Sequence, residues 1–342
     1  MCGGGGHGLG LRTIRAFASR PSAESASRGA RFLAAQLAAR GGKLREMAAS
    51  VQEVGAEQWF VTSAPSAATD SGDHVTMSAA IASEVAGLES MAAALARRVH
   101  DEGGKSNALQ ALCLAAFSEL LPLRVASVQL SKVSEAAASG ATQVEDVVRL
   151  VADGRQLIRD AALNASTEFG ELGGQGGGAA PVVCLEAVER SEMRMACMCV
   201  PEHLQYALHE LLLNALRANH LASSSAPVQV RMAAKGGVMG VAVRDSGAGI
   251  SPPHLSRALE CGWRGAEAGA TLHLVSAPQQ LKSLAACTLA ASALAGPPLR
   301  GFGMGLPLAR LHARALGGDL RLTSIAAVGT EAVLTWRQGG QP

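Results

Sequence analysis

The stretch "HELLLNALRANH", residues 209–220, decides how the rest of the sequence is interpreted. Glu210, Asn214 and Arg217 recur at steps of four and three residues, which stacks their side chains on one face of a helix. The leucines and alanine among them take the opposite face, as a helix packed on a core requires. A carboxylate, an amide and a guanidinium in one line on an apolar helix indicate a role beyond packing.

The composition of the whole chain limits the possible functions. At 342 residues, the chain is long enough for two domains of ordinary size. A net charge of +2 and only 3% aromatic residues give no case for a nucleic-acid partner. The seven cysteines show no CxxC pair and no zinc-finger spacing, so we expect them to stay reduced. The longest apolar stretch, 284–295, falls short of the roughly 20 residues of a membrane span, and we expect none.

The N-terminal segment has the composition of an organelle transit peptide. Five arginines lie between Leu9 and Phe32, and no acidic residue precedes Glu24. We therefore expect residues 1–28 to be a mitochondrial transit peptide. Chloroplast import and a disordered basic tail are the alternatives.

The next part of the chain has a helical pattern throughout. Four segments show apolar residues at spacings of three and four, namely 30–51, 77–100, 108–133 and 144–166. Short connections between them predict an antiparallel helical bundle over residues 29–169. The glycine-rich residues 170–180 cannot hold regular structure and predict a linker.

Beyond the linker the pattern changes from helical to alternating. We expect strands at 192–200, 228–234, 238–245, 320–325 and 331–336, and helices at 201–220, 252–260 and 305–317. Strand pairs joined by short turns predict a mixed sheet with helices on one face, an α/β sandwich over residues 181–338. The fold class is thus a helical bundle followed by an α/β domain.

Two glycine motifs accompany the polar helix. "DSGAGI" (245–250) places Asp245 at the end of a strand, and "GFGMGLPLARLHA" (301–313) leads into a helix. Glycines allow a sharp turn close to a flat ligand, and amides at a helix N-terminus can bind a polyphosphate. Taken alone, each motif could also be a hairpin turn or a flexible loop. The glycines concerned are Gly247 and Gly249 in the first motif, and Gly301, Gly303 and Gly305 in the second.

In this order, the three motifs resemble the boxes of the Bergerat ATP-binding fold, which sensor histidine kinases, DNA gyrase and the ninety-kilodalton heat-shock chaperone share. The closest likeness is to the mitochondrial kinases of the pyruvate and branched-chain 2-oxoacid dehydrogenase complexes. It rests on "ELLLNALRA" (210–218), "GFGMGLPLARLHARALGGDLRLTS" (301–324) and "VGTEAVL" (328–334). The resemblance runs from about 196 to 336, and more weakly over "SELLPLRVASVQL" (118–130).

The resemblance implies ATP and Mg²⁺ as cofactors and assigns a role to each site residue. Asn214 would bind the Mg²⁺ ion, and Glu210 would be the general base. Asp245 would accept a hydrogen bond from the adenine amino group, and Thr330 would support the same edge. The remaining predicted nucleotide contacts are Gly247 and Gly249 beside the ring, and Gly301, Gly303, Gly305 and Leu306 over the phosphates. For Arg217, a salt bridge and a role at the site stay open.

The sequence departs from the family pattern at two positions. Many pyruvate dehydrogenase kinases have a histidine four residues before the base, where this chain has Tyr206. Leu213 replaces the lysine that usually precedes the box asparagine, which puts one phosphate contact in doubt. His209 is no substitute for the missing histidine, because it lies about a quarter turn from Glu210.

The resemblance implies a protein serine/threonine kinase of the mitochondrial matrix, which phosphorylates and inactivates the dehydrogenase subunit of a 2-oxoacid dehydrogenase complex. It would dock on lipoyl domains through the helical bundle and form a homodimer. The target, pyruvate or branched-chain, stays open, and Tyr206 tilts the choice toward the branched-chain complex. The alternatives are an inactive ATP-binding regulatory module, suggested by Leu213 and the Ala-rich segment 261–300, and a sensor histidine kinase that uses His209.

Overall fold

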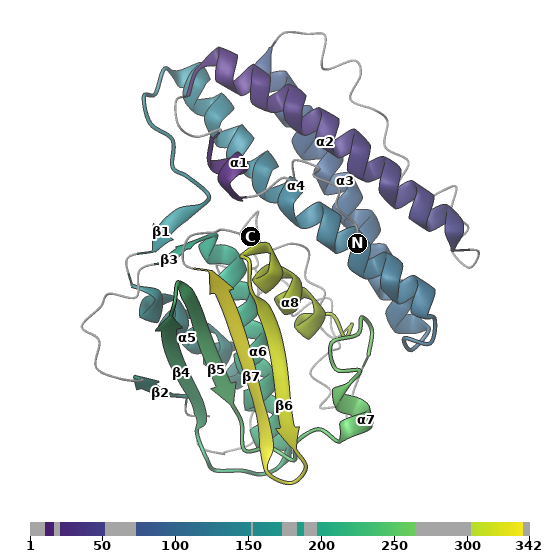
Figure 1. Cartoon of the computed structure of the whole chain (residues 1–342), viewed down its shortest axis with the longest axis vertical. Coiled ribbons are helices and arrows are strands. Elements are labelled where there is room, and N and C mark those ends of the chain that lie inside the picture. Colours follow the sequence, from purple (N-terminus) through teal and green to yellow (C-terminus); the bar gives the residue numbers. More distant parts are fainter. Residues whose placement is uncertain are drawn as a thin grey trace. The chain divides into compact units, whose positions relative to one another are not determined.

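The computed structural model describes residues 11–16, 21–51, 73–151, 153–172, 183–187, 197–263 and 302–337 (Figure 1). The chain divides into two compact units. Residues 1–92 and 115–148 belong to the first unit, and residues 93–114 and 149–341 belong to the second.

The first unit is built from long helices. They are α1 (Leu11–Ala16), α2 (Ala23–Ser50), α3 (His74–Asp101) as far as Ala92, and α4 (Asn107–Ser139) from Ala115 onward. A capping box starts α2: the Ser22 hydroxyl accepts from the Ser25 amide, and the Ser25 hydroxyl accepts from the Ser22 amide. Small and branched side chains at spacings of three and four then bury one face of α2, as at Ala30, Leu33 and Leu37.

Polar pairs fix how these helices lie together. Glu119 of α4 accepts from Arg40 of α2 at 2.6 Å and also pairs with Lys43. On the neighbouring helices, Arg124 contacts Glu89 at 3.0 Å, and Ser78 lies 3.3 Å from Ser131. Because partners on α3 and α4 run in opposite order along the chain, these two helices are antiparallel, as predicted.

The segment 144–166 does not form the single helix predicted for it. Residues Arg149–Val151 form the short strand β1, which pairs with β3 (Cys197–Cys199), and the helix α5 spans Gly154–Leu172. The aspartates before each element explain the break. Asp146 accepts from the Val148 amide and Asp153 from the Arg155 amide, and such local bonds compete with the helical ladder. The helix α5 packs along α6 in the second unit.

The second unit contains a five-stranded mixed sheet (Figure 1). Its strands, in spatial order, are β2 (Val183–Ala187), β4 (Val228–Lys235), β5 (Val238–Arg244), β7 (Gly329–Arg337) and β6 (Asp319–Ile325). β2 runs parallel to β4, and the other neighbours are antiparallel. The predicted mixed sheet is confirmed, although β2 was not predicted. The strand expected at 192–200 is described only as β3, which pairs with β1 outside this sheet.

Helices cover one face of this sheet (Figure 1). α6 (Pro201–Leu221) contacts β4, β5 and β7, while α8 (Gly305–Ala315) contacts β6 and β7 and packs on α6. The helix predicted at 252–260 is only the single turn α7 (Pro252–Leu255). Alternation along the strands supplies the facing core, in which Val241, Leu334 and Trp336 are almost fully buried. This layering is the predicted α/β sandwich.

In the part of the chain that the structure describes, two helices have the length and apolar composition of a membrane span, namely α3 and α4. The expectation of no membrane span was based on the apolar stretch 284–295, which lies outside both helices. Core helices of a bundle satisfy the same criteria. The polar side-chain pairs between α3 and α4 are contacts between two helices of one bundle. The absence of a membrane span therefore stays a prediction.

A cluster of charges joins α8 to β6. Arg310 donates to both carboxylate oxygens of Asp319, at 2.8 and 3.2 Å, and Arg314 donates to one of them at 3.2 Å. The hydrogen bonding from Arg310 is the largest cause that lowers the pKa of Asp319 to about 2, and the charge of Arg314 acts in the same direction. Directly after α8 the chain reverses its direction at Gly317, which has a φ of +75°. The cluster then holds the end of α8 over the edge strand β6.

We expect Asp319→Asn to destabilise the protein in a pH-dependent manner. The pKa of Asp319 is lower in the folded state than its ordinary value of 3.8. The cluster therefore contributes its full stabilisation of the folded state at pH values above the ordinary pKa of 3.8. This contribution is lost as the pH falls toward about 2. Urea unfolding of both proteins should show a difference at pH 7 that narrows at pH 3. A difference that is constant over this range would show that Asp319 acts through packing alone.

Candidate functional site

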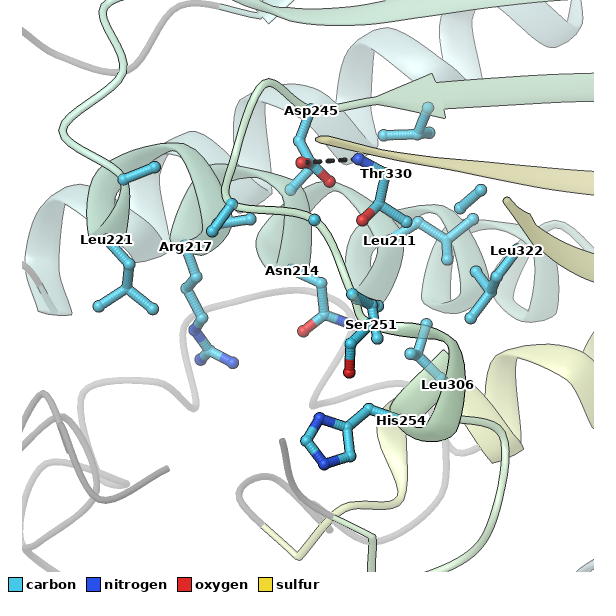
Figure 2. A pocket seen from close by; sticks show the side chains of 18 of the residues that line it. Leu211, Asn214, Arg217, Leu221, Asp245, Ser251, His254, Leu306, Leu322 and Thr330 are labelled. Carbon is cyan, nitrogen blue, oxygen red and sulfur yellow. Dashed lines mark hydrogen bonds between the residues drawn. The ribbon is translucent and has the colours of Figure 1, made fainter. Parts of the chain in front are cut away.

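A cavity of about 590 Å³ lies in the second unit, between α6, the ends of β5, β6 and β7, and the segment from Ala248 to Trp263 (Figure 2). Apolar side chains such as Leu211, Val243 and Leu322 form its walls. The polar side chains that line it are Asn214, Arg217, Asp245, Ser251, His254 and Thr330. An apolar cavity with a few convergent polar groups has the character of a small-molecule site.

The face of α6 that lines the cavity is set by helical spacing. Leu211, Asn214, Ala215 and Ala218 follow one another at steps of three, one and three and all border the cavity. Arg217 borders it too, and Figure 2 shows its side chain extending into the same space as Asn214. Of the three residues in the predicted polar line, Asn214 and Arg217 therefore line the cavity, and Arg217 belongs to the site.

Asp245 lies at the end of β5, where two amides converge on one of its oxygens. Oδ1 accepts from the Gly247 amide at 2.9 Å and from the Thr330 amide at 3.1 Å. Figure 2 draws the second of these bonds. The side chain is buried, and this desolvation raises the pKa of Asp245 although the two amides act in the opposite direction. Because Oδ1 takes both amides, Oδ2 can accept a hydrogen bond from a ligand.

Gly247 and Gly249 let the turn after Asp245 pack closely on both sides. A Cβ on Gly247 would lie 2.8 Å from the Cβ of Ala218 on α6. Gly249 has a φ of +71°, and a Cβ there would collide with the carbonyl of Ile325. Gly249 lines the cavity and Gly247 does not. The glycines thus seat the turn between α6 and the β6–β7 connection.

Hydrogen bonds join this turn to the β6–β7 connection. The Ala327 amide donates to the Ala248 carbonyl at 2.7 Å, and the Ile250 amide donates to the Ser324 hydroxyl at 2.7 Å. That hydroxyl lies 2.9 Å from the hydroxyl of Thr330, which borders the cavity. Two segments about 80 residues apart in the chain therefore form one rigid end of the site.

Asn219 was missed by the sequence analysis. Its side chain is buried in the last turn of α6, where Oδ1 accepts from the Ser246 amide at 2.7 Å. Its Nδ2 donates to the Ala226 carbonyl at 2.9 Å. The amide thus ties the turn that carries Asp245 to α6. A second asparagine two residues after Arg217, in an apolar helix, was the available signal.

Glu210 lies beside the cavity, not in its lining. It is one helical turn before Asn214, and its carboxylate fits against Gly305, where a Cβ would collide with it. Gly305 is the first residue of α8, and a helix N-terminus favours a nearby negative charge. Leu306, the next residue, does line the cavity. The predicted base is therefore buried at the junction of α6 and α8.

The second glycine motif begins outside the described residues, since Gly301 and the preceding segment from 264 are not described. Gly303 has a φ of +69° and packs against Gly262 and Trp263. The Gly262 amide donates to the Gly303 carbonyl at 3.2 Å. The described residues before position 264 and after position 301 therefore meet beside the cavity.

The two departures from the family pattern lie away from the cavity lining. Leu213 is only 1% exposed and belongs to the core. Tyr206 packs against His312 of α8, with ring centroids 4.9 Å apart. His209 is buried, with its Nε2 2.9 Å from Oε2 of Glu168, so it joins α6 to α5. A buried imidazole in this position does not suit a phospho-acceptor.

The donor set fits a magnesium ion bound together with a nucleotide. Among the described residues, no group of three or more histidine, cysteine or acidic side chains could hold a metal by itself. Asn214 offers one amide oxygen in the cavity. Mg²⁺ commonly takes one or two protein oxygens and completes its shell with phosphates and water, so one amide is compatible with it.

Comparison with known proteins agrees with this geometry. Residues 199–339 match the family described as histidine kinase-, DNA gyrase B-, and HSP90-like ATPase. Mitochondrial [pyruvate dehydrogenase (acetyl-transferring)] kinases are similar over part of the chain: 32% identical for the Schizosaccharomyces pombe protein, 31% for Ascaris suum and 32% for human isozyme 1. The matched segments cover 43%, 42% and 40% of this chain, and 34%, 31% and 27% of those relatives. The matched part thus spans about a third of the relatives' length, and the resemblance stated from the motifs is confirmed.

We expect Asn219→Ala to loosen the turn that carries Asp245. The substitution removes two part-buried hydrogen bonds, one from the Ser246 amide and one to the Ala226 carbonyl, each of which contributes about 0.5 to 1.5 kcal/mol of folding free energy. In hydrogen exchange, the Ser246 amide should lose protection, while the Asp245 amide, bonded to the Thr330 carbonyl, should keep it. Asn164→Ala on α5 is the matched control. Unchanged protection at Ser246 would contradict the role given to Asn219.

Proposed function

Because residues 199–339 match the histidine kinase-, DNA gyrase B- and HSP90-like ATPase family, we propose that this chain is a Mg²⁺-ATP-dependent protein kinase of the 2-oxoacid dehydrogenase kinase type. One observation carries the proposal. A buried carboxylate at a strand end, Asp245, faces the same cavity as the helical amide Asn214, and a buried carboxylate, Glu210, lies one turn along that helix.

The substrate that we propose is a serine on the dehydrogenase subunit of a 2-oxoacid dehydrogenase complex, whose phosphorylation would inactivate it. The similar proteins are named as pyruvate dehydrogenase kinases, which favours pyruvate dehydrogenase over the branched-chain enzyme. Tyr206 had favoured the branched-chain complex, but it packs against His312 between α6 and α8 and does not line the cavity. The experiment below includes both dehydrogenases.

Each site residue has a defined task in this mechanism. Oδ2 of Asp245 accepts from the adenine amino group, while the Thr330 hydroxyl supports the same edge. Asn214 holds Mg²⁺, which neutralises phosphate charge when bound. Glu210 accepts the proton of the substrate hydroxyl. Gly303, Gly305 and Leu306 lead the chain over the phosphate end, and Gly301 would continue it.

We extend the proposal to location and assembly. Residues 1–28 would direct the chain to the mitochondrial matrix, and the described helix α1 within them contains Arg12 and Arg15, as an arginine-rich leader requires. The helical bundle, predicted over 29–169, would dock on lipoyl domains of the acyltransferase core, and the kinase would act as a homodimer. Because α5 runs to Leu172 and packs along α6, the predicted linker 170–180 would begin only after Leu172, and α5 would belong with the kinase domain predicted over 181–338.

We expect Asp245→Asn to bind ATP more weakly without loss of folding. An asparagine oxygen can still accept both amides, but its nitrogen then faces the adenine amino group, which leaves a donor unpaired. The cost is about 1 to 3 kcal/mol, or about one to two orders of magnitude in Kd. Calorimetry with Mg²⁺-ATP measures it, and equal affinities would remove Asp245 from the site.

The melting temperature of the ligand-free Asp245→Asn variant is the control. Burial raises the pKa of Asp245, so its contribution to stability is present below the ordinary pKa and lost as the pH rises through the folded-state value. At pH 7 the amide removes this cost. The variant should melt at or above the temperature of the unsubstituted protein.

We expect Glu210→Gln to separate catalysis from binding. The variant should keep ATP affinity within a few-fold and slow phosphoryl transfer by about 10² or more, because only proton abstraction is lost. The assay is transfer of labelled γ-phosphate to pyruvate and branched-chain dehydrogenase subunits, with and without their lipoyl-bearing cores. Glu202→Gln, in the first turn of α6 and paired with Arg149, is the control and should retain activity.

The outcome of this assay distinguishes the candidate functions. An acid-stable phosphoserine on one dehydrogenase, lost in Glu210→Gln only, supports the kinase and identifies its target. Unsubstituted protein that binds ATP and labels neither subunit would contradict the kinase and support an inactive regulatory module. An acid-labile label on His209 would instead support a sensor histidine kinase.

A further inference from the structure

The charges around the cavity are few and unevenly placed. Among the described residues that line it, the ionisable side chains are Arg217, Asp245 and His254. Figure 2 shows Asp245 and Thr330 at one end, and Arg217 and His254 beyond Asn214 at the other. Leu213 brings no charge, because it is buried in the core. Any cationic contact from these residues to an anionic ligand therefore comes from Arg217 and His254.

The local structure presents the His254 ring to the cavity. α7 starts with Pro252 and Pro253, whose fixed φ suits the first turn of a helix, and the preceding Ile250 is anchored to Ser324. The His254 ring leans on Trp263, with centroids 5.8 Å apart and planes tilted by 48°, and both residues line the cavity. The ring is half-buried, and its nitrogens have no hydrogen-bond partner in the described part of the chain. They are available to a ligand.

An imidazole that contacts a phosphate can make the binding of that phosphate depend on pH. An unperturbed imidazole titrates near pH 6.5, and a nearby phosphate favours its charged form. By linkage, a polyphosphate must then bind more tightly when the imidazole is protonated. The charged side chains that line the cavity together with His254 are Arg217 from α6 and Asp245 from β5. On its own segment, Arg257 and Glu260 pair with each other at 3.0 Å.

We infer that His254 is a phosphate-contacting residue that forms the cationic side of the cavity together with Arg217 and makes nucleotide affinity depend on pH. The inference rests on the proposed binding of ATP. It adds a residue on the wall opposite α6. This residue lies outside the three sequence motifs, to which all the predicted phosphate contacts belong. The ligand class is a nucleoside di- or triphosphate, and the contact lies on phosphate, not on the base.

The test is calorimetry of ATP, ADP and AMP with saturating Mg²⁺ at pH 6.0 and 8.0. For the unsubstituted protein we expect ATP and ADP to bind about 3- to 10-fold more tightly at pH 6.0, and AMP to show a smaller ratio. His254→Gln should reduce this ratio to the part that the titration of the nucleotide itself causes, and His254→Arg should bind tightly at both pH values. His220→Gln, on the exposed side of α6 and outside the cavity lining, should keep it. Comparing variants at one pH cancels the titration of the nucleotide itself.

Each outcome decides the inference. A His254→Gln variant with the pH ratio of the unsubstituted protein would overturn the contact, and so would an arginine variant that binds ATP no more tightly than the glutamine variant at pH 8.0. A pH ratio equally large for AMP and ATP would move the contact away from the distal phosphates and also contradict it. Unsubstituted protein that binds no ATP at either pH would instead overturn the proposed nucleotide function.

Discussion

Two backbone amides meet at Oδ1 of Asp245, and the geometry of the cavity depends on that meeting. The Thr330 amide ties β5 to the start of β7, and the Gly247 amide sets the direction of the turn that follows. With that oxygen occupied, the other is the one presented to a ligand. The buried carboxylate costs folding free energy at neutral pH, as its raised pKa indicates. A residue that destabilises the empty protein is typical of a site arranged for a ligand.

Periodicity and strand ends were enough to predict the parts of the site that are local in sequence. Asn214 and Arg217 followed from steps of four and three along α6, and Asp245 followed from its place after β5. Local bonding explains one error: Asp146 and Asp153 accept backbone amides and interrupt the helix expected over 144–166. A helical pattern does not register such competition.

The remaining features depend on contacts that are distant in sequence. Asn219 acts on Ser246 and Ala226, which lie in two other loops. Glu210 shares a helical face with Asn214, yet the packing of α8 decides that its carboxylate meets Gly305 and not the cavity. β2 pairs with β4 in parallel, more than 40 residues further along the chain, and short parallel strands carry no alternation to reveal them. His254 needed the fold to bring α7 opposite α6.

The hydrogen bond from the Gly262 amide to the Gly303 carbonyl joins two points that lie about 40 residues apart in the sequence. It brings together the two ends of the sequence between Trp263 and Phe302, so that sequence departs and returns at nearly one point. Closing a loop costs only about 0.6 kcal/mol more for each doubling of its length. The two segments that build the Asp245 end, 245–250 and 324–330, are bonded to each other. A change in the number of residues between Gly262 and Gly303 therefore adds little to the entropic cost of joining them.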